Sequence, residues 1–465
     1  MIGLASDKKN DNLPFFVASF ILISIGYAFS KGLFFHPAQV FFLLLGWLVL
    51  FLPFLKQKPI NFDFSANHLL LAAGACCFCL FLFFDESMYI NSRPLVFNLF
   101  SLKAVAFWFF LFYFIDLNVS NKNFFGITVL HLAKYKFVYL LLIAFCLRLL
   151  TIFASPNPQI DVFWFLQGGA DSLLSGHNPY SEIFFNPYSP QQGQQLYGTA
   201  DFQNDNYSYW PSTVIFTTIF KFLFGDVRFA YVFAIFGAGA AIYYLARKKF
   251  FQTKQIAELL TLLIIYLPLS LFVLEQAWSE PLSIFLLALF VLFSFLDLGF
   301  WPYLIFSLFL GVKQVSLVFL FFLIRFKEID WKKYSLTLGG LVILIIPFLI
   351  WQPFDFIDDT IINLILYKPS LHSLSLNTIS RVDFYTSISA LIYLPILFLL
   401  IGFLWIKTKR DLAGIIHAAL VFLLALFIIR QGYANYYYGI LGWLVILMTL
   451  EFRKTDQTKN EYENK

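Results

Sequence analysis

Long runs of hydrophobic residues, separated by short polar segments, extend along almost the whole chain. A membrane-spanning helix needs about 20 largely apolar residues, because each residue rises about 1.5 Å across a hydrocarbon core of about 30 Å. Fourteen runs predict such crossings, two of them short. They cover residues 14–30, 38–55, 68–84, 97–117, 136–154, 228–246, 256–274, 281–298, 301–312, 314–326, 335–352, 386–406, 412–430 and 434–452.

The two short runs, 301–312 and 314–326, flank Lys313. About 12 helical residues rise only about 18 Å, so neither run can cross the membrane core alone. Backbone that turns at such a depth must face protein or a cavity, because lipid cannot satisfy its polar groups. We therefore expect a helical hairpin whose turn, at Lys313, faces a water-filled cavity open to the outside.

The basic residues predict which loops lie on which side of the membrane. Short cytoplasmic loops hold most of the Lys and Arg in membrane proteins. With the N-terminus inside, 22 of the 32 Lys and Arg residues fall in cytoplasmic segments or the C-terminal tail. The loops between these cytoplasmic segments then face outward, and we expect the functional residues on that side.

One predicted external loop, residues 155–227, is unusually long. The stretch 149–220 that contains most of it has no Lys or Arg. Its segment 211–224 is apolar but has only about 14 residues, which predicts a helix lying on or dipping into the membrane rather than a crossing. A second external loop is expected at 353–385. The acidic residues of 149–220 are Asp161, Asp171, Glu182, Asp201 and Asp205.

Each of these two loops contains an amphipathic segment. In 161–175, one helical face is apolar and the other carries Asp161, Asp171 and small polar residues, a pattern typical of a helix in the outer membrane interface. The segment 355–368 has the same character. We expect the polar faces of both helices to border water or a cavity.

The composition agrees with this pattern and excludes most other classes of protein. Of the 465 residues, 60% are hydrophobic, 13% are charged and 63 are Phe, whereas soluble domains are about 25% charged. The net charge of +5 follows from loop topology, so we expect no nucleic-acid partner. The predicted fold is an all-α, polytopic membrane bundle. Four cysteines, which we interpret as packing residues, lie inside apolar runs: Cys76, Cys77, Cys79 and Cys146.

Three cations lie in or at the ends of predicted spans: Arg148, Lys313 and Arg430. Each costs roughly 2.5–3.5 kcal/mol within a membrane on insertion scales, so each calls for a reason. By the predicted topology all three approach the external half of the bilayer. Their side chains could instead extend to the lipid headgroups.

The polar loop residues also have simpler explanations. Asp161 precedes an apolar helix and could serve as an N-cap. Asp171 is typical of a solvated helix face. The tyrosines of 433–438 lie where an aromatic belt at the membrane interface is expected.

The order of residues in the long loop is informative. Arg148 is followed by Ile160-Asp161-Val162-Phe163 and Gly169-Ala170, and the loop continues with 173–180 (Leu-Leu-Ser-Gly-His-Asn-Pro-Tyr) and 207–211 (Tyr-Ser-Tyr-Trp-Pro). This order resembles the first large external loop of GT-C-type glycosyltransferases. Within them it is most similar to the polyprenyl-phosphate-mannose-using members, such as the GPI mannosyltransferase I family and its bacterial relatives.

The resemblance implies an integral membrane enzyme that moves a sugar, mannose first of all, from a polyprenyl-phosphate carrier to a glycolipid or glycan acceptor on the external face. Asp161 corresponds to the family's loop carboxylate, and we expect it to act as general base. A departing lipid phosphate needs positive charge in a poorly solvated site. The expected donor-phosphate residues are Arg430, Lys313 and Arg148, and the weaker candidates for sugar or acceptor contacts are Asp171, Tyr180, Tyr209 and Trp210.

The chain departs from the family pattern in two places. Some relatives carry a second Asp two residues before the loop carboxylate, where this chain has Gln159. We therefore expect no metal and no cofactor. Four predicted spans also precede the matching helix, which divides the chain into an N-terminal extension, residues 1–130, and a GT-C-like module, residues 131–465. The expected location is a bacterial inner membrane, with the site on the periplasmic or external side.

Other functions fit parts of the pattern. A flippase or transporter of a lipid-linked or small anionic solute would also use intramembrane cations and an outward cavity, but it predicts polar groups on several spans near the midplane. An O-antigen ligase or polymerase would carry its main external loop later in the chain. A scaffold without activity leaves the three cations unexplained.

Overall fold

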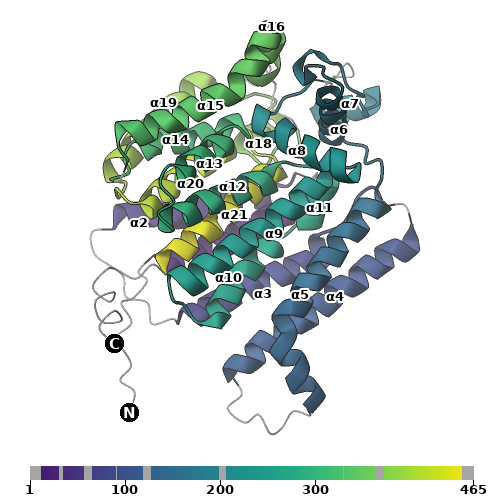
Figure 1. Cartoon of the computed structure of the whole chain (residues 1–465), viewed down its shortest axis with the longest axis vertical. Helices are drawn as coiled ribbons and strands as arrows, with labels where there is room; N and C mark the ends of the chain where they lie inside the picture. Colours follow the sequence, from purple (N-terminus) through teal and green to yellow (C-terminus); the bar gives the residue numbers. More distant parts are fainter. Residues whose placement is uncertain are drawn as a thin grey trace.

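The chain folds into helices, and no strand occurs among the residues that the structure describes (Figure 1). The structure is a computed structural model that describes residues 12–30, 35–56, 65–90, 92–118, 127–197, 206–327, 329–362 and 371–452. The all-α prediction is confirmed for these residues.

The α-helices follow one another as α1 (Leu13–Ala28), α2 (Pro37–Leu55), α3 (Ala66–Phe84), α4 (Arg93–Asn118), α5 (Ile127–Ala154), α6 (Asp161–Leu174), α7 (Pro190–Tyr197), α8 (Pro211–Phe224), α9 (Arg228–Tyr244), α10 (Lys254–Ile265), α11 (Ser270–Glu275), α12 (Glu280–Phe295), α13 (Trp301–Leu310), α14 (Leu317–Leu323), α15 (Trp331–Trp351), α16 (Pro353–Ile357), α18 (Leu376–Asp383), α19 (Ala390–Lys407), α20 (Leu412–Ile429) and α21 (Ala434–Glu451). Four short segments join them: the 3-10 turns η2 (Pro179–Ser181) and η4 (Gln314–Ser316), and the π-helical segments η3 (Leu245–Lys249) and η5 (Asp358–Ile362).

Eight of the described helices are long and apolar enough to cross a membrane: α2, α3, α4, α5, α9 with η3, α15, α19 and α20. Side-chain oxygens accept hydrogen bonds from N–H groups in the first turn of several of these helices. Ser65 caps α3 in this way, and Asp411 caps α20. These helices indicate a multi-pass membrane protein. Five other apolar helices have only 10–17 residues: α1, α8, α12, α13 and residues 314–323.

One expected span is not a continuous helix. The run 256–274 is divided into α10 and α11 by a break at residues 266–269. Pro268 explains the break, because proline lacks an N–H group and disfavours helical backbone at the residue before it. Leu269 then adopts a left-handed backbone with φ of 57°. The break leaves peptide groups that need partners from elsewhere in the protein.

The helices predicted within the external loops are present. α6 covers most of the expected segment 161–175 and buries Phe163 and Leu166 while leaving Asp171 exposed. α8 coincides with the short apolar segment 211–224 and packs against α6 and α9. Of the segment 355–368, residues up to 362 form the end of α16 and η5, and the remainder lies outside the described residues.

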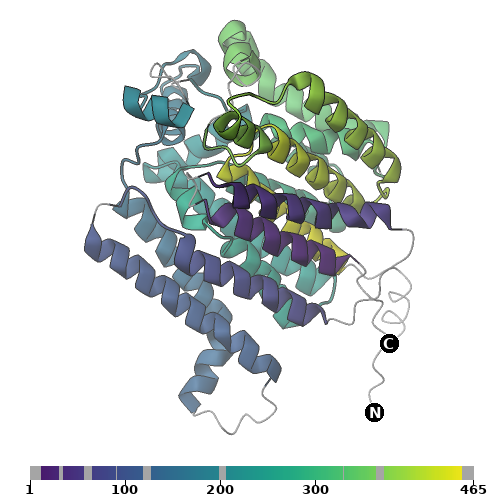
Figure 2. The ribbon, with the colours of Figure 1, turned by 180° about the vertical axis from the view of Figure 1, so that it is seen from behind.

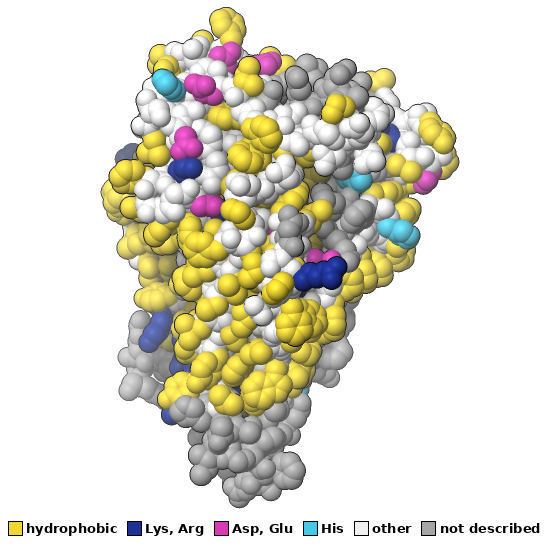
Figure 3. Space-filling model, turned by 90° about the vertical axis from the view of Figure 1, so that its right-hand side faces the viewer, with side chains coloured by type: hydrophobic (Ala, Val, Ile, Leu, Met, Phe, Trp, Pro, Cys, Tyr) yellow, Lys and Arg dark blue, Asp and Glu magenta, His cyan; other side chains and the backbone are white. Residues whose placement is uncertain are grey.

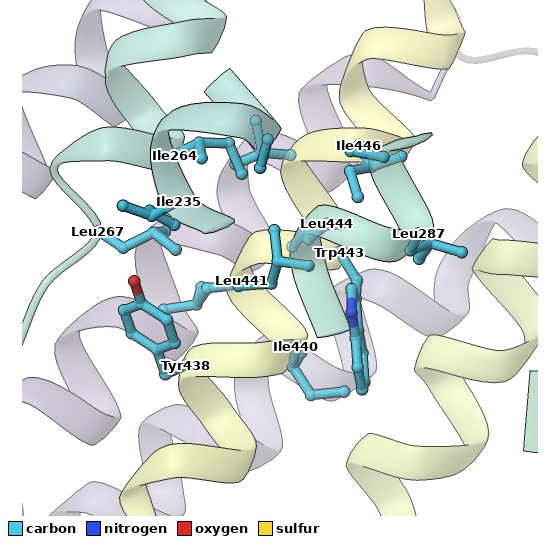
Figure 4. Close-up of a cluster of buried hydrophobic side chains, with 14 of the residues drawn as sticks. Ile235, Ile264, Leu267, Leu287, Tyr438, Ile440, Leu441, Trp443, Leu444 and Ile446 are labelled. Atoms are coloured by element: carbon cyan, nitrogen blue, oxygen red, sulfur yellow. The ribbon is translucent and has the colours of Figure 1, made fainter. Parts of the chain in front are cut away.

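α21 is the central helix of the bundle, in contact with α1, α10, α12 and α20. Figure 4 shows its side chain Leu441 among apolar residues of neighbouring helices, including Ile264 of α10 and Leu287 of α12. All three side chains are fully buried. The first turn of α21, with Asn435 and Tyr436, is thereby held inside the protein.

The N-terminal helices share this core rather than standing apart from it. α1 packs against α2 and α21, α2 against α20, and α3 against α10, on the rear face shown in Figure 2. Polar contacts reinforce the packing: Trp47 Nε1 donates to the Val421 carbonyl at 3.0 Å, and His417 Nε2 lies 2.7 Å from the Leu50 carbonyl.

Loops that the charge pattern assigns to the external side meet at one end of the bundle. Tyr89 donates to the Gln159 carbonyl at 2.9 Å. Gln314 Nε2 donates to the carbonyls of Ser208 at 3.1 Å and Thr360 at 2.7 Å. Four loops far apart in the sequence are thus hydrogen-bonded at this end, all connected through the 155–227 loop. In Figure 3 acidic side chains lie in the upper part of the visible face, and hydrophobic side chains dominate below them.

Loops assigned to the cytoplasmic side also contact one another. Gln252 Nε2 donates to the Phe452 carbonyl at 3.2 Å, and the Lys327 N–H donates to the Arg410 carbonyl at 2.9 Å. In Figure 1 these loops lie at the ends of α9, α10, α14 and α20 that point away from α6 and α16. The fold therefore separates the two sets of loops that sequence charge separates.

Cysteine labelling tests the sidedness. Ser189→Cys and Lys409→Cys each place a thiol at an exposed position, one in each set of loops. On intact cells a membrane-impermeant maleimide should label Ser189→Cys, whereas Lys409→Cys should react only after lysis. The unsubstituted protein, whose four cysteines lie in α3 and α5, is the background control. Labelling of both positions from the same side would contradict the arrangement.

Candidate functional site

Lys313 lies in a buried ion pair where three segments meet. It occupies the extended link between α13 and η4, and only 8% of its surface is exposed. Its Nζ donates to Glu280 Oε1, in the first turn of α12, at 2.5 Å. Asn435 Nδ2, from α21, donates to the same oxygen at 3.0 Å. Both charges are thus paired inside the protein, as low-dielectric surroundings require.

Two tyrosine rings flank the Lys313 ammonium group. Nζ lies 4.7 Å from the ring centroid of Tyr209 and 4.8 Å from that of Tyr436. Aromatic rings attract a cation at such distances. Tyr209 belongs to the long loop just before α8, so the loop reaches the intramembrane cation directly.

A small hollow adjoins the ion pair. Its volume is about 10 Å³, close to the room that one water molecule needs. Three buried polar atoms of its lining have no hydrogen-bond partner: Glu280 Oε2, Ser316 Oγ and Trp443 Nε1. Because buried polar groups are nearly always hydrogen-bonded, these atoms indicate a place for water or for polar ligand atoms. The other lining residues are Ser283, Lys313, Val315, Phe427 and Tyr436.

Asp161 is the first residue of α6, and only 4% of its surface is exposed. Its Oδ1 accepts hydrogen bonds from the Tyr188 hydroxyl at 3.0 Å and from the Val162 N–H at 2.8 Å. The N-cap position belongs to Ile160, so Asp161 is not the N-cap. The positive end of the helix dipole favours a carboxylate at this position.

Tyr209 links α6 with the ion pair. The centroid of its ring lies 5.5 Å from that of Phe165, which follows Asp161 by one turn of α6. Burial raises the pKa of the Tyr209 hydroxyl, and the negative charges of Glu280 and Asp161 raise it further. One aromatic side chain thus contacts both the Lys313 ammonium group and the helix that begins with Asp161. Arg430, at the C-terminal end of α20, lies within electrostatic range of Tyr436, the other ring beside Lys313.

Arg148 has a different environment. Its guanidinium group is buried and donates to the carbonyls of Ala144, at 3.0 Å, and Ile265. It also lies 3.4 Å from Ser270 Oγ. Arg148 therefore satisfies backbone at the break between α10 and α11, and burial contradicts the alternative that it extends to the headgroups. Among the described contacts, none joins it to Lys313 or Arg430.

The expected sugar contacts divide into two groups. Asp171 forms a 3.2 Å ion pair with Lys221, which links α6 to α8 on the surface. Tyr180 is buried and donates to the Tyr209 carbonyl at 2.8 Å, which fixes the backbone beside Lys313. Trp210, next to Tyr209, is buried with its indole N–H unpartnered. Tyr209 contacts the Lys313 ammonium group, Trp210 follows it in the chain, Tyr180 fixes its carbonyl, and Asp171 lies apart in a surface ion pair.

Sequence reasoning did not identify Glu280, Asn435 and Gln314. Glu280 stands at the edge of a predicted span and was assigned to a loop between crossings. The available signal was an unmatched carboxylate beside an apolar run, in a chain that also has an unmatched Lys313. Gln314 joins the long loop to η5 through the carbonyls of Ser208 and Thr360, which a sequence pattern does not reveal.

Another buried carboxylate, Asp359, lies in η5. Burial and the nearby charges of Asp358 and Asp355 together raise its pKa to about 7, against hydrogen bonds from Asn206 and the Tyr207 backbone, which oppose the rise. Its Oδ2 has no hydrogen-bond partner. Within the described ranges, no three His, Cys, Asp or Glu side chains gather as a metal site would require.

No protein-family model, no curated protein and no solved structure matches the chain. The functional interpretation therefore depends on the geometry of these residues and on the resemblance of the loop.

Removing one charge of the buried pair should destabilise the protein far more than removing both. Lys313→Met leaves the Glu280 carboxylate buried without its cation, at a cost of about 3–5 kcal/mol. Combining Lys313→Met with Glu280→Gln should recover most of this loss. Thermal unfolding in detergent measures the effect, and Lys221→Met, which breaks the surface pair with Asp171, is the matched control at below about 1 kcal/mol. Additive losses in the double variant would contradict a direct pair.

Stability should also depend on pH through Asp359. Its folded pKa of about 7 lies above the ordinary value of 3.8, so the folded state holds this proton more tightly than the unfolded state. The contribution of Asp359 to stability is therefore greatest below about pH 4 and declines as the pH rises towards 7. Asp359→Asn removes the decline, so the variant should unfold at a higher temperature than the wild type at pH 8 and at a similar temperature near pH 4. Parallel curves across this range would refute the assignment.

Proposed function

We propose that this chain is an integral membrane glycosyltransferase that transfers a sugar, mannose first of all, from a polyprenyl-phosphate donor to an acceptor hydroxyl on the external face. The observation that supports this best is the position of Tyr209, whose ring lies beside the buried ammonium group of Lys313 and packs against Phe165, one turn after the buried Asp161 in α6. A carboxylate and a cation are the two groups that such a transfer needs.

Asp161 acts as the general base in this proposal. The acceptor oxygen attacks the anomeric carbon while its proton passes to the Asp161 carboxylate, and the bond from the anomeric carbon to the phosphate oxygen breaks with its electron pair. One displacement inverts the configuration at the anomeric carbon. Tyr188, which donates to Asp161 at 3.0 Å, keeps the carboxylate ionised and oriented until the acceptor binds.

Lys313 stabilises the negative charge of the departing lipid phosphate, assisted by Arg430 beyond Tyr436. A cation in a poorly solvated site does this far better than one in water. Glu280 is the resident partner of Lys313, so a phosphate must take the place of this carboxylate. Arg148 is not included in the donor site, because its guanidinium group already donates hydrogen bonds to backbone carbonyls.

Tyr209 and Trp210 are the proposed contacts of the sugar, with the unpartnered groups of the hollow as further hydrogen-bonding positions. The lipid tail stays in the bilayer, next to the short helices α13 and α14 and the lipid-exposed surface of α15 and α19. In this proposal the chain crosses the membrane about fourteen times, counting the hairpin. The site then lies on the periplasmic side of a bacterial inner membrane.

A transporter or flippase of a lipid-linked or anionic solute is the second candidate. The pair Glu280–Lys313 and its partner Asn435 lie on or beside apolar helices, as a transporter predicts for its binding site. This candidate requires movement of the intact solute, whereas the transferase requires cleavage of the bond between sugar and phosphate. The products therefore distinguish the two.

Asp161→Asn should reduce sugar transfer by about 10²–10⁴-fold while leaving the unfolding temperature unchanged. Purified protein is incubated with polyprenyl-phosphate-mannose and a membrane-lipid acceptor pool, and released polyprenyl phosphate is measured. Asp171→Asn, a carboxylate on the exposed face of the same helix, is the matched control and should retain activity. Full activity of Asp161→Asn would exclude this residue as base, and passage of intact donor across proteoliposomes without cleavage would favour the transporter.

A further inference from the structure

We propose that the loop after α3 in the N-terminal extension holds the backbone around the candidate site, and that Tyr89 in this loop is a positioning residue for Asp161. The part that concerns Asp161 rests on the proposed function. The loop comprises residues 85–90, between α3 and α4, and we name it the 85–90 loop.

Two carboxylates connect the 85–90 loop reciprocally with the start and end of α11. The Asp85 carboxylate accepts from the N–H groups of Leu271 and Phe272, each at 3.0 Å. In return, Glu275 accepts from the N–H groups of Met88 at 2.6 Å and Tyr89 at 3.1 Å. Each segment thus supplies the anion that the other segment's free amide groups need.

The break between α10 and α11 makes these bonds necessary. Helix ends leave backbone groups without partners, and at membrane depth water does not replace them. Asp85 satisfies the N–H groups after the break, Tyr27 of α1 donates to the Pro268 carbonyl within it, and Arg148 donates to the Ile265 carbonyl before it. Two of these three side chains come from the N-terminal extension.

A buried cation secures Asp85 itself. Lys103 of α4 is buried, and its Nζ donates to the Asp85 backbone carbonyl at 2.7 Å. Burial raises the pKa of the Asp85 carboxyl, and the positive charge of Lys103 opposes this rise. The 85–90 loop is therefore held both by α4, through Lys103, and by α11.

Tyr89 extends the arrangement to the candidate catalytic loop. Its hydroxyl donates to the Gln159 carbonyl at 2.9 Å, two residues before Asp161. Its backbone N–H donates to Glu275, so Tyr89 joins α11 to the segment before α6. Burial raises the pKa of Tyr89, and the charges of Glu275 and then Asp161 raise it further.

Arg228 holds the same segment from α9. Its guanidinium group donates to the Ser155 carbonyl at 2.7 Å and to the Ile152 carbonyl at 3.2 Å. Residues 155–160 are thus fixed at one end by Arg228 and at the other by Tyr89. Because hydrogen bonds are directional, this pair determines where α6, and with it Asp161, begins.

Tyr89→Phe in the full-length protein tests the inference, because it removes one hydroxyl and keeps the ring. Hydrogen–deuterium exchange of the backbone at 155–161 should accelerate about fivefold, as expected for the loss of one hydrogen bond. Tyr113→Phe is the matched control. It removes a 2.8 Å hydrogen bond to Glu258, which joins α4 to α10 at the other end of the bundle, and should leave exchange at 155–161 unchanged.

The kinetic readout separates positioning from general destabilisation. Tyr89→Phe should lower kcat several-fold with little change in KM, whereas Tyr113→Phe, with a similar change in unfolding temperature, should alter neither. Asp85→Asn should accelerate exchange at 270–275 in the same protein. If this variant does not fold, the Tyr89→Phe result still decides the matter.

The possible outcomes distinguish failure of this inference from failure of the proposed function. Unchanged exchange at 155–161 in Tyr89→Phe, or equal acceleration in Tyr113→Phe, overturns the inference whatever the activity of the wild type. Faster exchange in Tyr89→Phe alone, with wild-type protein that transfers no sugar, supports the structural role of the loop and counts against the proposed function. Faster exchange with an unchanged kcat refutes Tyr89 as a positioning residue.

Discussion

Every charge and every free peptide group inside an apolar bundle needs a partner from the protein itself, since neither lipid nor bulk water provides one. This constraint explains the polar architecture of the chain. Lys313 is paired with Glu280, Arg148 with the carbonyls before the helix break, and Asp85 with the amide groups after it. The partners come from distant parts of the sequence, so the polar groups determine how the helices assemble.

The aromatic side chains of the long loop link these internal polar contacts to the end of the bundle where α6 lies. Tyr180 fixes the Tyr209 carbonyl, and Tyr209 in turn covers the Lys313 ammonium group. The loop is therefore an inner wall of the site as well as a surface segment. This explains why a stretch without any Lys or Arg is so rich in buried tyrosine and tryptophan.

The sequence predicts the helices far better than it predicts their partners. Hydrophobic runs identified the eight long apolar helices and the two short ones around Lys313, because burial in lipid requires only composition and length. Amphipathicity identified α6, and charge separated two sets of loops that the fold also separates. The break at Pro268 was missed because apolar residues continue across it.

The site was predictable only in part. Asp161, Lys313 and Tyr209 are predicted from residue type and position, and in the structure Tyr209 contacts both Lys313 and α6, the helix that begins with Asp161. Glu280 and Asn435 are not predicted, because the sequence shows an unmatched carboxylate and an unmatched lysine but does not show that the two pair across 33 positions. Arg148 was assigned to the donor because its charge was evident, while the carbonyls that occupy it were not.

The internal pairing of Lys313 has a consequence for any anion that enters. Such an anion can pair with the Lys313 ammonium group only if Glu280 no longer does. Its net affinity is therefore the difference between its own attraction to Lys313 and that of Glu280. The carboxylate also remains nearby to reclaim the cation. A site of this kind exchanges a bound anion readily, even in so dry an environment.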